Sequence, residues 1–270
     1  MTIMKTLKFI GIAIGTILFC VNFSACSKEV EPQYELVTGE KKITRLEINS
    51  SDFGYSLWDF KYDNAGKLLK VIHNNGEYTQ EHDYVWNNDA IISPYGVASL
   101  NDGLIRNYNS YYDVRYNDGR LVEITDLTTS KYAYRFSWIS SGEFYSRGVY
   151  DGGTQGYLTE SFRFIYDSDM PTIKTNGFNP IIPYVLSSGF YENPLCVAHP
   201  ELIGGRTDIL PTHFSKTYYW FDENDRNVSE TINGICNYKF DGEGYITECN
   251  MCSDDGNEFG FEEKYTIVWN

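Results

Sequence analysis

The sequence predicts an all-β protein: an antiparallel meander of about 14 to 16 strands that forms a strongly curved sheet or an open barrel. Aromatic residues make up 16% of the 270 residues, and they suit the half-buried surface of a sheet better than a helix interior. From Ile43 onward, short aromatic and β-branched runs alternate with clusters of Asp, Asn and Gly, without a long helical periodicity. A single open sheet with so many strands usually curls or closes.

The first 25 residues are interpreted as a secretory signal peptide. Lys5 and Lys8 precede an apolar run from Phe9 to Val21, and small residues follow it, which is the order found in exported proteins. The apolar run is too short to span a membrane comfortably. We therefore expect a signal peptide over residues 1–25, a linker over residues 26–40 and one β domain over residues 41–270.

Cys26 follows Phe23-Ser24-Ala25, and this tetrapeptide resembles the bacterial lipobox, whose cysteine becomes the lipidated first residue of the mature chain. The resemblance implies a lipid anchor in the outer membrane, on its periplasmic or its cell-surface face. The following run, Ser27 to Glu31, is similar to the acidic tether of some Bacteroidetes surface lipoproteins. The alternative is an ordinary secreted protein in which Cys26 is free or disulfide-bonded.

A hairpin motif recurs along the chain. An aromatic residue closes one strand, Asp or Asn caps the turn, and Gly takes a positive φ before the next strand. The close copies are Phe60–Leu69, Val114–Val122 and Tyr238–Thr247, and the looser copies are Tyr84–Ala90, Phe164–Met170 and Tyr219–Asp225. Pairing the first copy across its turn sets Tyr62 opposite Lys67, Phe60 opposite Leu69 and Trp58 opposite Val71.

Other clusters of turn residues belong to the opposite end of the predicted sheet. They begin at His73, Asp126, Asp151, Thr231 and Ser253. The exception to this alternation is an inserted segment over residues 175–213, which contains five prolines, and proline is excluded from central strands. We interpret it as a crossing segment, with a short helical turn, that covers part of the sheet; a segment of this length is often functional.

The hairpins, with the pattern Tyr/Phe-Asp-x-x-Gly-x-Leu, resemble the YD repeats of Rhs-type shells. Together with the lipobox and the segment Gly204–Pro211, they resemble a Bacteroidetes lipoprotein family of unknown function. The resemblance covers nearly the whole mature chain and implies a porin-like, many-stranded β fold. It implies no catalytic residues, because the family has no assigned activity.

Charge and motifs exclude several function classes. Lys and Arg total 22 against 37 Asp and Glu, and a net charge of -15 repels phosphate backbones, so no nucleic-acid partner is expected. The sequence contains no phosphate loop, dinucleotide fingerprint or Gly-x-Ser-x-Gly elbow, and we expect no cofactor.

No metal site is expected either. The four histidines, which we place in turns or loops, lack zinc-ligand spacing: His73, His82, His199 and His213. A convergence of His199 and Glu201 with Asp208 and His213 is possible in the inserted segment, but a solvated loop is the plainer interpretation. The acidic groups are interpreted as turn caps, not calcium ligands: Asp222-Glu223 with Asp225, and Asp254-Asp255 with Glu258. Sequence spacing cannot identify a glycosidase pair, which is defined by distance in space.

Four cysteines remain in the β domain, an even number in an exported chain. Pairing the last hairpin across Asp241–Gly244 sets Cys236 opposite Cys249, which predicts a cross-strand disulfide. Cys252 then points to the other face, and Cys196 in the inserted segment is its expected partner. The spacing Cys249-x-x-Cys252 also suits a redox site, but such motifs open a helix and this one lies on a predicted strand.

Exposed aromatics are the remaining candidate for a binding site. A platform for stacking sugar rings would use Tyr108, Tyr111, Tyr112, Tyr132, Tyr134, Tyr145 and Tyr150; the alternative is cross-strand packing of these rings. We expect a noncatalytic envelope module that binds a glycan or another envelope protein. Two alternatives stay open: an envelope enzyme such as a glycan hydrolase with a carboxylate pair, and a structural lipoprotein that docks to a partner.

Overall fold

Among the described residues, seventeen strands form one antiparallel sheet, which confirms the predicted fold class. The computed structural model describes residues 41–51, 54–109, 111–128, 132–138, 144–152, 156–167, 174, 193–204, 209–223, 226–253 and 261–270. These residues belong to one compact unit, residues 36–270. The other unit, residues 1–35 with Cys26, lies outside the described residues, so the signal peptide and lipid anchor stay predictions.

The strands follow the chain in order. They are β1 (Ile43–Ser50), β2 (Gly54–Tyr62), β3 (Leu68–Asn74), β4 (Thr79–Asp83), β5 (Val85–Trp86), β6 (Ala90–Ser93), β7 (Gly96–Asn101), β8 (Leu104–Tyr108), β9 (Tyr112–Asn117), β10 (Arg120–Asp126), β11 (Tyr132–Trp138), β12 (Phe144–Asp151), β13 (Tyr157–Ile165), β14 (His213–Phe221), β15 (Asn227–Phe240), β16 (Ile246–Ser253) and β17 (Glu262–Trp269). Among described residues, no helix is long and apolar enough to span a membrane.

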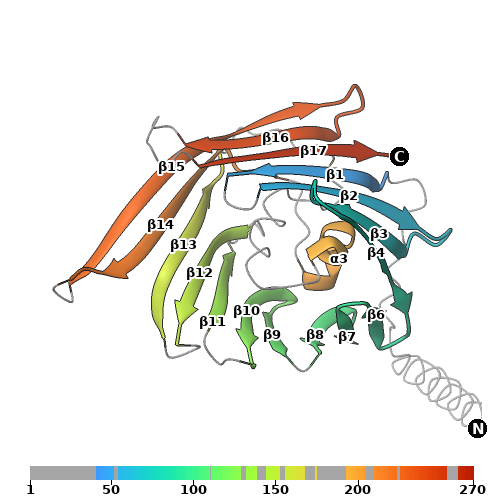
Figure 1. Ribbon diagram of the computed structural model, residues 1–270, viewed down its shortest axis with the longest axis horizontal. Helices are drawn as coiled ribbons and strands as arrows, with labels where there is room; N and C mark the ends of the chain where they lie inside the picture. The colour runs from blue at the N-terminus through green and yellow to red at the C-terminus, as the bar shows by residue number, and fades with distance from the viewer. Residues whose placement is uncertain are drawn as a thin grey trace, which may run out of the picture. The chain divides into compact units, whose positions relative to one another are not determined.

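Each strand pairs with its neighbour in sequence, apart from one interruption at Tyr84, between β4 and β5. The last strand, β17, pairs with β1, so that Ile48 lies opposite Tyr265. The sheet is therefore a nearly closed barrel, as Figure 1 shows. The pairing of β1 with β17 removes the free edges that these two strands would have in an open sheet.

The turns of the first and third close copies of the hairpin are each built around one carboxylate. Asp63 Oδ1 accepts hydrogen bonds from the backbone N–H groups of Ala65, at 2.9 Å, and of Lys67, at 2.8 Å. Gly66 takes a φ of 80°, which suits glycine. The third close copy repeats this arrangement at Asp241, whose Oδ1 accepts from Glu243 and Tyr245. The predicted chemistry of the motif is confirmed at both turns.

The predicted register of these hairpins is wrong by two residues. Phe60 lies opposite Val71, and Trp58 lies opposite His73. In the last repeat Cys236 lies opposite Met251, and Tyr238 lies opposite Cys249. Two features add one residue each: the turn is one residue longer than predicted, so that Tyr62 pairs with Leu68 and Phe240 with Ile246, and a bulge lies beside each turn.

The turn predicted at Thr231 is also wrong, because residues 231–234 lie inside the 14-residue strand β15. Gly234 pairs with Phe214, and a Cβ atom on Gly234 would lie 2.3 Å from the Phe214 ring. The glycine therefore makes room for an aromatic ring and does not form a turn. The other predicted clusters adjoin chain reversals between β3 and β4, β10 and β11, β12 and β13, and β16 and β17.

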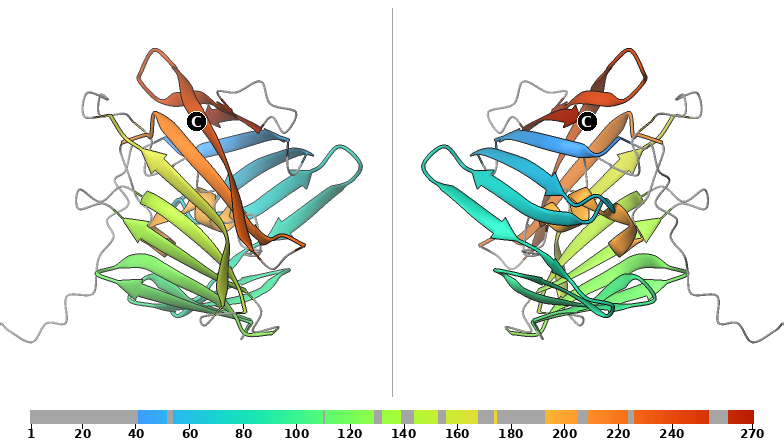
Figure 2. Two further views of the ribbon diagram at one scale, coloured as in Figure 1. Left: turned by 90° about the vertical axis from the view of Figure 1, so that its left-hand side faces the viewer. Right: turned by 90° about the vertical axis from the view of Figure 1, so that its right-hand side faces the viewer.

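Part of the inserted segment is enclosed by the sheet. It includes a short helix, α3 (Asn193–Ala198), and a 3-10 turn, η2 (Pro200–Ile203), which Figure 2 shows between the walls of the barrel. Leu195, Cys196 and Leu202 are buried in the hydrophobic core with the inward side chains of the strands. We call the face toward α3 the inner face of the sheet.

The inserted segment contacts all three close copies of the hairpin motif. His199 Nε2 accepts a hydrogen bond from the N–H of Leu68, at 3.2 Å, and Tyr116 donates its hydroxyl to the carbonyl of Leu202, at 3.4 Å. Tyr238 donates its hydroxyl to the carbonyl of Pro211, at 2.6 Å. These hairpins therefore both build the sheet and hold the segment inside it.

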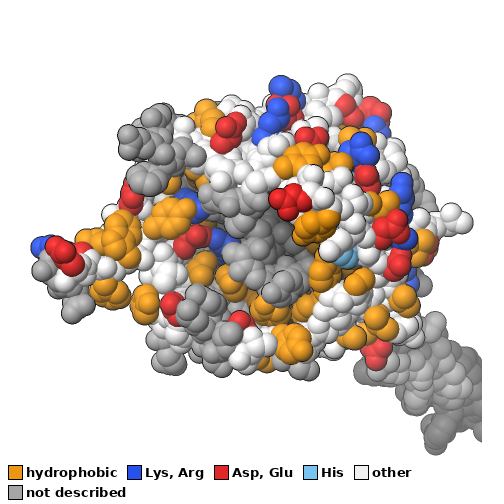
Figure 3. All heavy atoms as spheres, in the orientation of Figure 1, with side chains coloured by type: hydrophobic (Ala, Val, Ile, Leu, Met, Phe, Trp, Pro, Cys, Tyr) orange, Lys and Arg blue, Asp and Glu red, His pale blue; other side chains and the backbone are white. Residues whose placement is uncertain are grey.

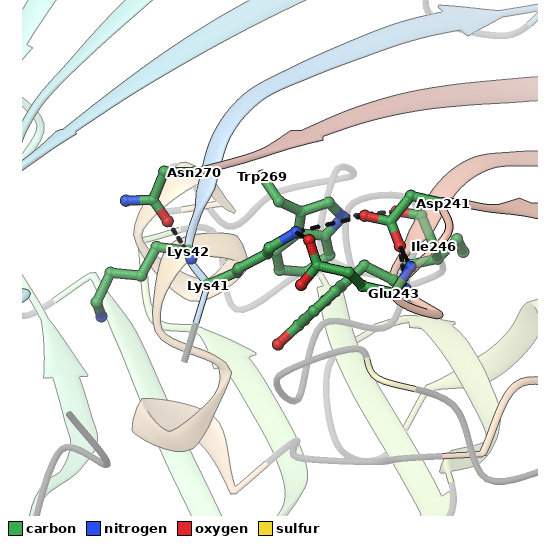
Figure 4. Close-up of polar contacts among 8 residues, drawn as sticks. Lys41, Lys42, Asp241, Glu243, Ile246, Trp269 and Asn270 are labelled. Atoms are coloured by element: carbon green, nitrogen blue, oxygen red, sulfur yellow. Dashed lines mark hydrogen bonds and ion pairs between the residues drawn. The ribbon is translucent and has the colours of Figure 1, made fainter. Parts of the chain in front are cut away.

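Hydrogen bonds and ion pairs of side chains stabilise the region where the first strand, β1, pairs with the last strand, β17 (Figure 4). We call this pairing the seam. The backbone N–H of Lys42 donates to Asn270 Oδ1, at 2.7 Å, and the indole of Trp269 donates to the carbonyl of Ile246, at 2.6 Å. Lys41 Nζ lies 2.6 Å from Glu243 and 3.5 Å from Asp241. The third hairpin turn thus also supports the closure of the barrel.

Candidate functional site

The paired outward side chains over residues 215–221 of β14 and residues 227–233 of β15 carry no charge. Four cross-strand pairs make up this surface: Ser215 with Asn233, Thr217 with Thr231, Tyr219 with Ser229, and Phe221 with Asn227. They point outward because the alternating positions Phe214 and Lys216 are buried on the inner face. We call these eight residues the neutral face.

Aromatic rings are exposed at the far end of the neutral face. Phe221 and Tyr157 are each 52% exposed, and their rings meet edge to face with centroids 5.6 Å apart. Trp220 is 45% exposed as well, but it lies at an alternate position and points to the opposite side of the hairpin. Figure 3 shows hydrophobic side chains gathered on the hairpin that projects at the left, where Figure 1 draws the ends of β14 and β15.

Hydroxyl groups on the neutral face are arranged across strands. The Thr217 and Thr231 hydroxyls are 3.0 Å apart, and Tyr219 extends the row to Ser161 of β13, at 3.5 Å. Beyond the strand ends, Asp222 is neutralised by Arg226, whose Nη2 lies 2.7 Å from its carboxylate. Exposed rings beside hydroxyl and amide groups are the side-chain chemistry that binds uncharged polar molecules.

The candidate tyrosine platform is not assembled on the surface by the tyrosines whose side chains the structure describes. Tyr108, Tyr112 and Tyr134 are buried on the inner face, where the first two rings stack at 6.4 Å. Tyr111 is exposed, and Tyr150 is covered by the guanidinium of Arg135 at 4.4 Å. The side chains of Tyr132 and Tyr145 lie outside the described residues. Cross-strand packing therefore accounts for the buried rings.

The inner face carries a polar cluster around two histidines. Ser56 Oγ lies 2.8 Å from His73 Nε2, and Tyr95 Oη lies 2.8 Å from His82 Nε2. The histidine rings lie 6.4 Å apart, and Trp58 meets His73 edge to face at 6.1 Å. We call these five residues the inner histidine cluster. It corrects the expected placement of His73 and His82 in turns or loops, since both lie in strands, β3 and β4.

Burial keeps both histidines of this cluster neutral near pH 7. It lowers the pKa of His73, with a smaller contribution from the neighbouring His82. It also lowers the pKa of His82, although Asp83 acts in the opposite direction. A neutral imidazole has one N–H donor and one acceptor nitrogen, so each ring still forms directional hydrogen bonds.

The suggested convergence in the inserted segment occurs only in part. His199 is buried, and its Nδ1 lies 2.7 Å from Glu201 Oε1. Burial opposes ionisation of Glu201, but the His199 hydrogen bond brings its pKa below the ordinary value. His213 is exposed at the start of β14 and contacts Thr212, while Asp208 lies outside the described residues. The His199–Glu201 pair holds the segment to the first hairpin.

The acidic groups behave as turn caps where the structure describes them. Asp222 Oδ1 accepts from the backbone N–H of Arg226, at 2.9 Å. Glu223 is exposed, and Asp225, Asp254, Asp255 and Glu258 lie outside the described residues. No group of three potential metal ligands occurs among the described side chains.

Cys236 and Cys249 are free thiols in the described part of the chain. Cys236 and Cys249 share the inner face as diagonal neighbours, since Cys236 lies opposite Met251, and burial raises the pKa of Cys236 to about 12. Cys196 is enclosed in α3, whereas Cys252 pairs with Ile235 on the outer face, so the expected bridge to Cys196 would have to cross the sheet. Both disulfides remain predictions. The predicted register that supported the Cys236–Cys249 bridge is wrong, because Cys236 lies opposite Met251.

Sequence reasoning missed the charged groups buried on the inner face. Lys216 is 1% exposed and lies over the rings of Tyr218 and Phe261, while Arg147 pairs with Glu160. Glu263 is buried and accepts a hydrogen bond from Ser50. Alternation within the strands could have assigned these residues to the inner face, because each lies two positions from an aromatic or aliphatic residue that packs in the core: Phe214 for Lys216, Val149 for Arg147, Phe162 for Glu160 and Tyr265 for Glu263.

The fold defines an all-β protein whose single sheet forms a nearly closed barrel around a helical segment. No family model and no curated protein matches the chain. Among solved structures it is similar to a porin-like protein from Bacteroides uniformis, with 12% identity and a TM-score of 0.42, over 84% of this chain and 98% of that one. It is also similar to TcdB2-TccC3, with 10% identity and a TM-score of 0.32, over 84% of this chain and 12% of that one.

Proposed function

We propose that the protein is a noncatalytic binding module of the bacterial envelope that captures an uncharged glycan on the neutral face. The observation that carries this proposal is the composition of that face: eight outward residues without a charge, in a chain with a net charge of -15. Charged groups would have to lose water when a neutral sugar covered them, and here that cost is absent.

Geometry supports an extended ligand. Side chains at alternating positions of two paired strands form rows, so a linear polysaccharide can contact several hydroxyl and amide groups at once. The exposed rings of Phe221 and Tyr157 provide apolar surface for the C–H face of a sugar ring. Many weak contacts along one chain then add to a useful affinity.

The location in the cell belongs to the same proposal. Export followed by lipid attachment at Cys26 would place the module on the outer membrane, on its periplasmic or surface side, where glycans are available. Mass spectrometry of the mature N-terminus checks this part, because a lipidated Cys26 must be its first residue.

Binding is tested by affinity electrophoresis and calorimetry with neutral polysaccharides, namely dextran, mannan, starch and laminarin, against anionic alginate. We expect retention by at least one neutral polymer and none by alginate. Replacing Phe221 and Tyr157 together by Ala should weaken binding about tenfold, which corresponds to about 1.4 kcal/mol of lost stacking.

Phe240→Ala provides the matched control, because Phe240 is a 42% exposed phenylalanine near the third hairpin turn. It should bind like the unmodified protein. Equal losses in the control and the double variant, or no retention by any neutral polymer, would contradict the proposal. Turnover of the polymer would instead identify the envelope enzyme, and copurification of a specific envelope protein would identify the docking lipoprotein.

A further inference from the structure

We infer that the inner histidine cluster binds a small uncharged molecule through acceptor oxygen atoms. The inference concerns the opposite face of the sheet from the neutral face and does not rest on the proposed glycan capture. Its starting point is Trp58, which is 8% exposed and whose indole Nε1 is fully buried and has no hydrogen-bond partner among the described residues.

The unpaired indole is an exception among the tryptophans of this protein. Trp86, Trp138 and Trp269 donate their indole N–H groups to the carbonyls of Leu68, Leu121 and Ile246, at 2.8, 2.6 and 2.6 Å. Trp220, the remaining tryptophan, is 45% exposed, so water can reach it. A buried donor without a partner costs about 1–3 kcal/mol, and such a donor indicates a missing acceptor.

The neighbours of Trp58 add donors to the same cluster. A serine or tyrosine hydroxyl that donates to a histidine Nε2 leaves the ring proton on Nδ1. This arrangement satisfies Ser56 with His73 and Tyr95 with His82, at 2.8 Å each. In this tautomer His73 and His82 each have an Nδ1–H donor, in addition to the indole N–H of Trp58. The cluster therefore offers several donors and calls for acceptor oxygens.

The charge of the inner histidine cluster and of the whole chain determines whether a neutral or an anionic acceptor suits the cluster. Burial lowers the pKa of both histidines, so the cluster carries no positive charge at pH 7, and the chain as a whole is strongly negative. An anionic ligand would gain no ion pair here and would meet overall repulsion. A carbonyl or hydroxyl oxygen forms the same hydrogen bonds without that penalty. Because Ser56 and His73 are only partly buried, the ligand can reach the cluster from solvent.

The indole N–H signals provide a direct test by two-dimensional proton–nitrogen NMR. The five tryptophans should give five indole signals, and Trp58→Phe, which retains an aromatic ring against His73, identifies the Trp58 signal by its loss. N-acetylglucosamine is the neutral probe and acetate the anionic one. We expect the sugar to shift the Trp58 signal in a saturable manner, while the Trp86, Trp138 and Trp269 signals stay in place.

Affinity provides the second measurement. Trp58→Phe should weaken binding of the sugar about tenfold, the usual effect of losing one buried hydrogen bond. The Phe221→Ala and Tyr157→Ala double variant should show the same Trp58 shift as the unmodified protein, which separates this site from the neutral face. Absence of a saturable shift with the sugar, or a shift with acetate alone, would overturn the inference. A folded Trp58→Phe protein with unchanged affinity would overturn it as well.

Discussion

Single carboxylates determine how two of the repeated turns are built. Asp63 and Asp241 each accept two backbone hydrogen bonds through one oxygen atom, so the two N–H groups are paired although the strands have not yet begun. Aspartate suits this position because its short side chain reaches the backbone of the residues that follow it. The aspartate of the motif is therefore explained by two backbone N–H groups in the turn that need a hydrogen-bond acceptor.

Replacing Asp63 by Ala should lower the free energy of unfolding by about 1–2 kcal/mol, because two backbone N–H groups lose their acceptor. Asp63→Asn keeps an acceptor oxygen and should cost less. Urea denaturation of both variants checks the order. An alanine variant as stable as the unmodified protein would show that water replaces the carboxylate without cost.

Acid should weaken the turn at Asp241. Hydrogen bonds from the N–H groups of Tyr245 and Glu243, with a further contribution from Lys41, hold the pKa of Asp241 below its ordinary value of 3.8. A depressed pKa contributes stability above the unfolded value, and this contribution is lost as the pH falls through the folded value. Denaturation from about pH 5 to about pH 2 should show a smaller acid-induced loss in Asp241→Asn than in the unmodified protein. Parallel pH curves for the two proteins would contradict the assignment.

At the scale of elements, the two-residue error in register affects which residues pair across the strands, but not which face each side chain lies on. Alternation correctly assigns Trp58 and Phe60 to the inner face, because a shift by two residues leaves every side chain on its side. It gives the wrong partners, since the length of each turn and the bulge beside it depend on the three-dimensional packing of the hairpin. Faces were therefore predictable, and cross-strand contacts such as the expected Cys236–Cys249 pair were not.

The candidate sites were harder to predict from the sequence than the faces of the strands. His73 and His82 pack together because β3 and β4 pair, and Tyr95 reaches them from the turn after β6. No spacing rule connects three such positions. The neutral face shows a weak signal, in that alternate residues of Phe214–Phe221 are Ser, Thr, Tyr and Phe, but only pairing with β15 shows that the uncharged residues form one surface.

The enclosed segment depends on a close backbone contact at Gly204. This residue follows η2 with a φ of 64°, and a Cβ atom there would lie 1.8 Å from the carbonyl oxygen of Gly119. Gly204→Ala should therefore destabilise the protein by about 1–3 kcal/mol and expose the segment to protease. Thermal unfolding and limited proteolysis measure both effects. Gly242→Ala is the control, because its Cβ meets no atom within 4 Å; similar protease sensitivity in both variants would contradict the proposed contact.

For the whole molecule, closure between β1 and β17 is the decisive feature. Deleting residues 262–270 removes β17 and leaves β1 and β16 each with an unpaired edge. Such edges pair with other chains, so the truncated protein should form oligomers or aggregate. Light scattering coupled to size-exclusion chromatography checks this. The full-length variant Val268→Ser, altered at an outward position that is 45% exposed, should behave like the unmodified protein. A monomeric truncated protein with cooperative unfolding would show that the seam is dispensable.

Because β1 pairs with β17 at the seam, the barrel can close only after the C-terminal strand has been synthesised. A ribosome adds about 5–20 residues per second, so β1 leaves it roughly 10 to 40 s before β17 is complete. Throughout that interval one edge of β1 lacks its final partner, however well the intervening hairpins have formed. Completion of the sheet is therefore a late event that waits for the C-terminal strand. A chain that is still being synthesised cannot yet complete its sheet. This delay leaves time for the export that we propose, before the barrel closes.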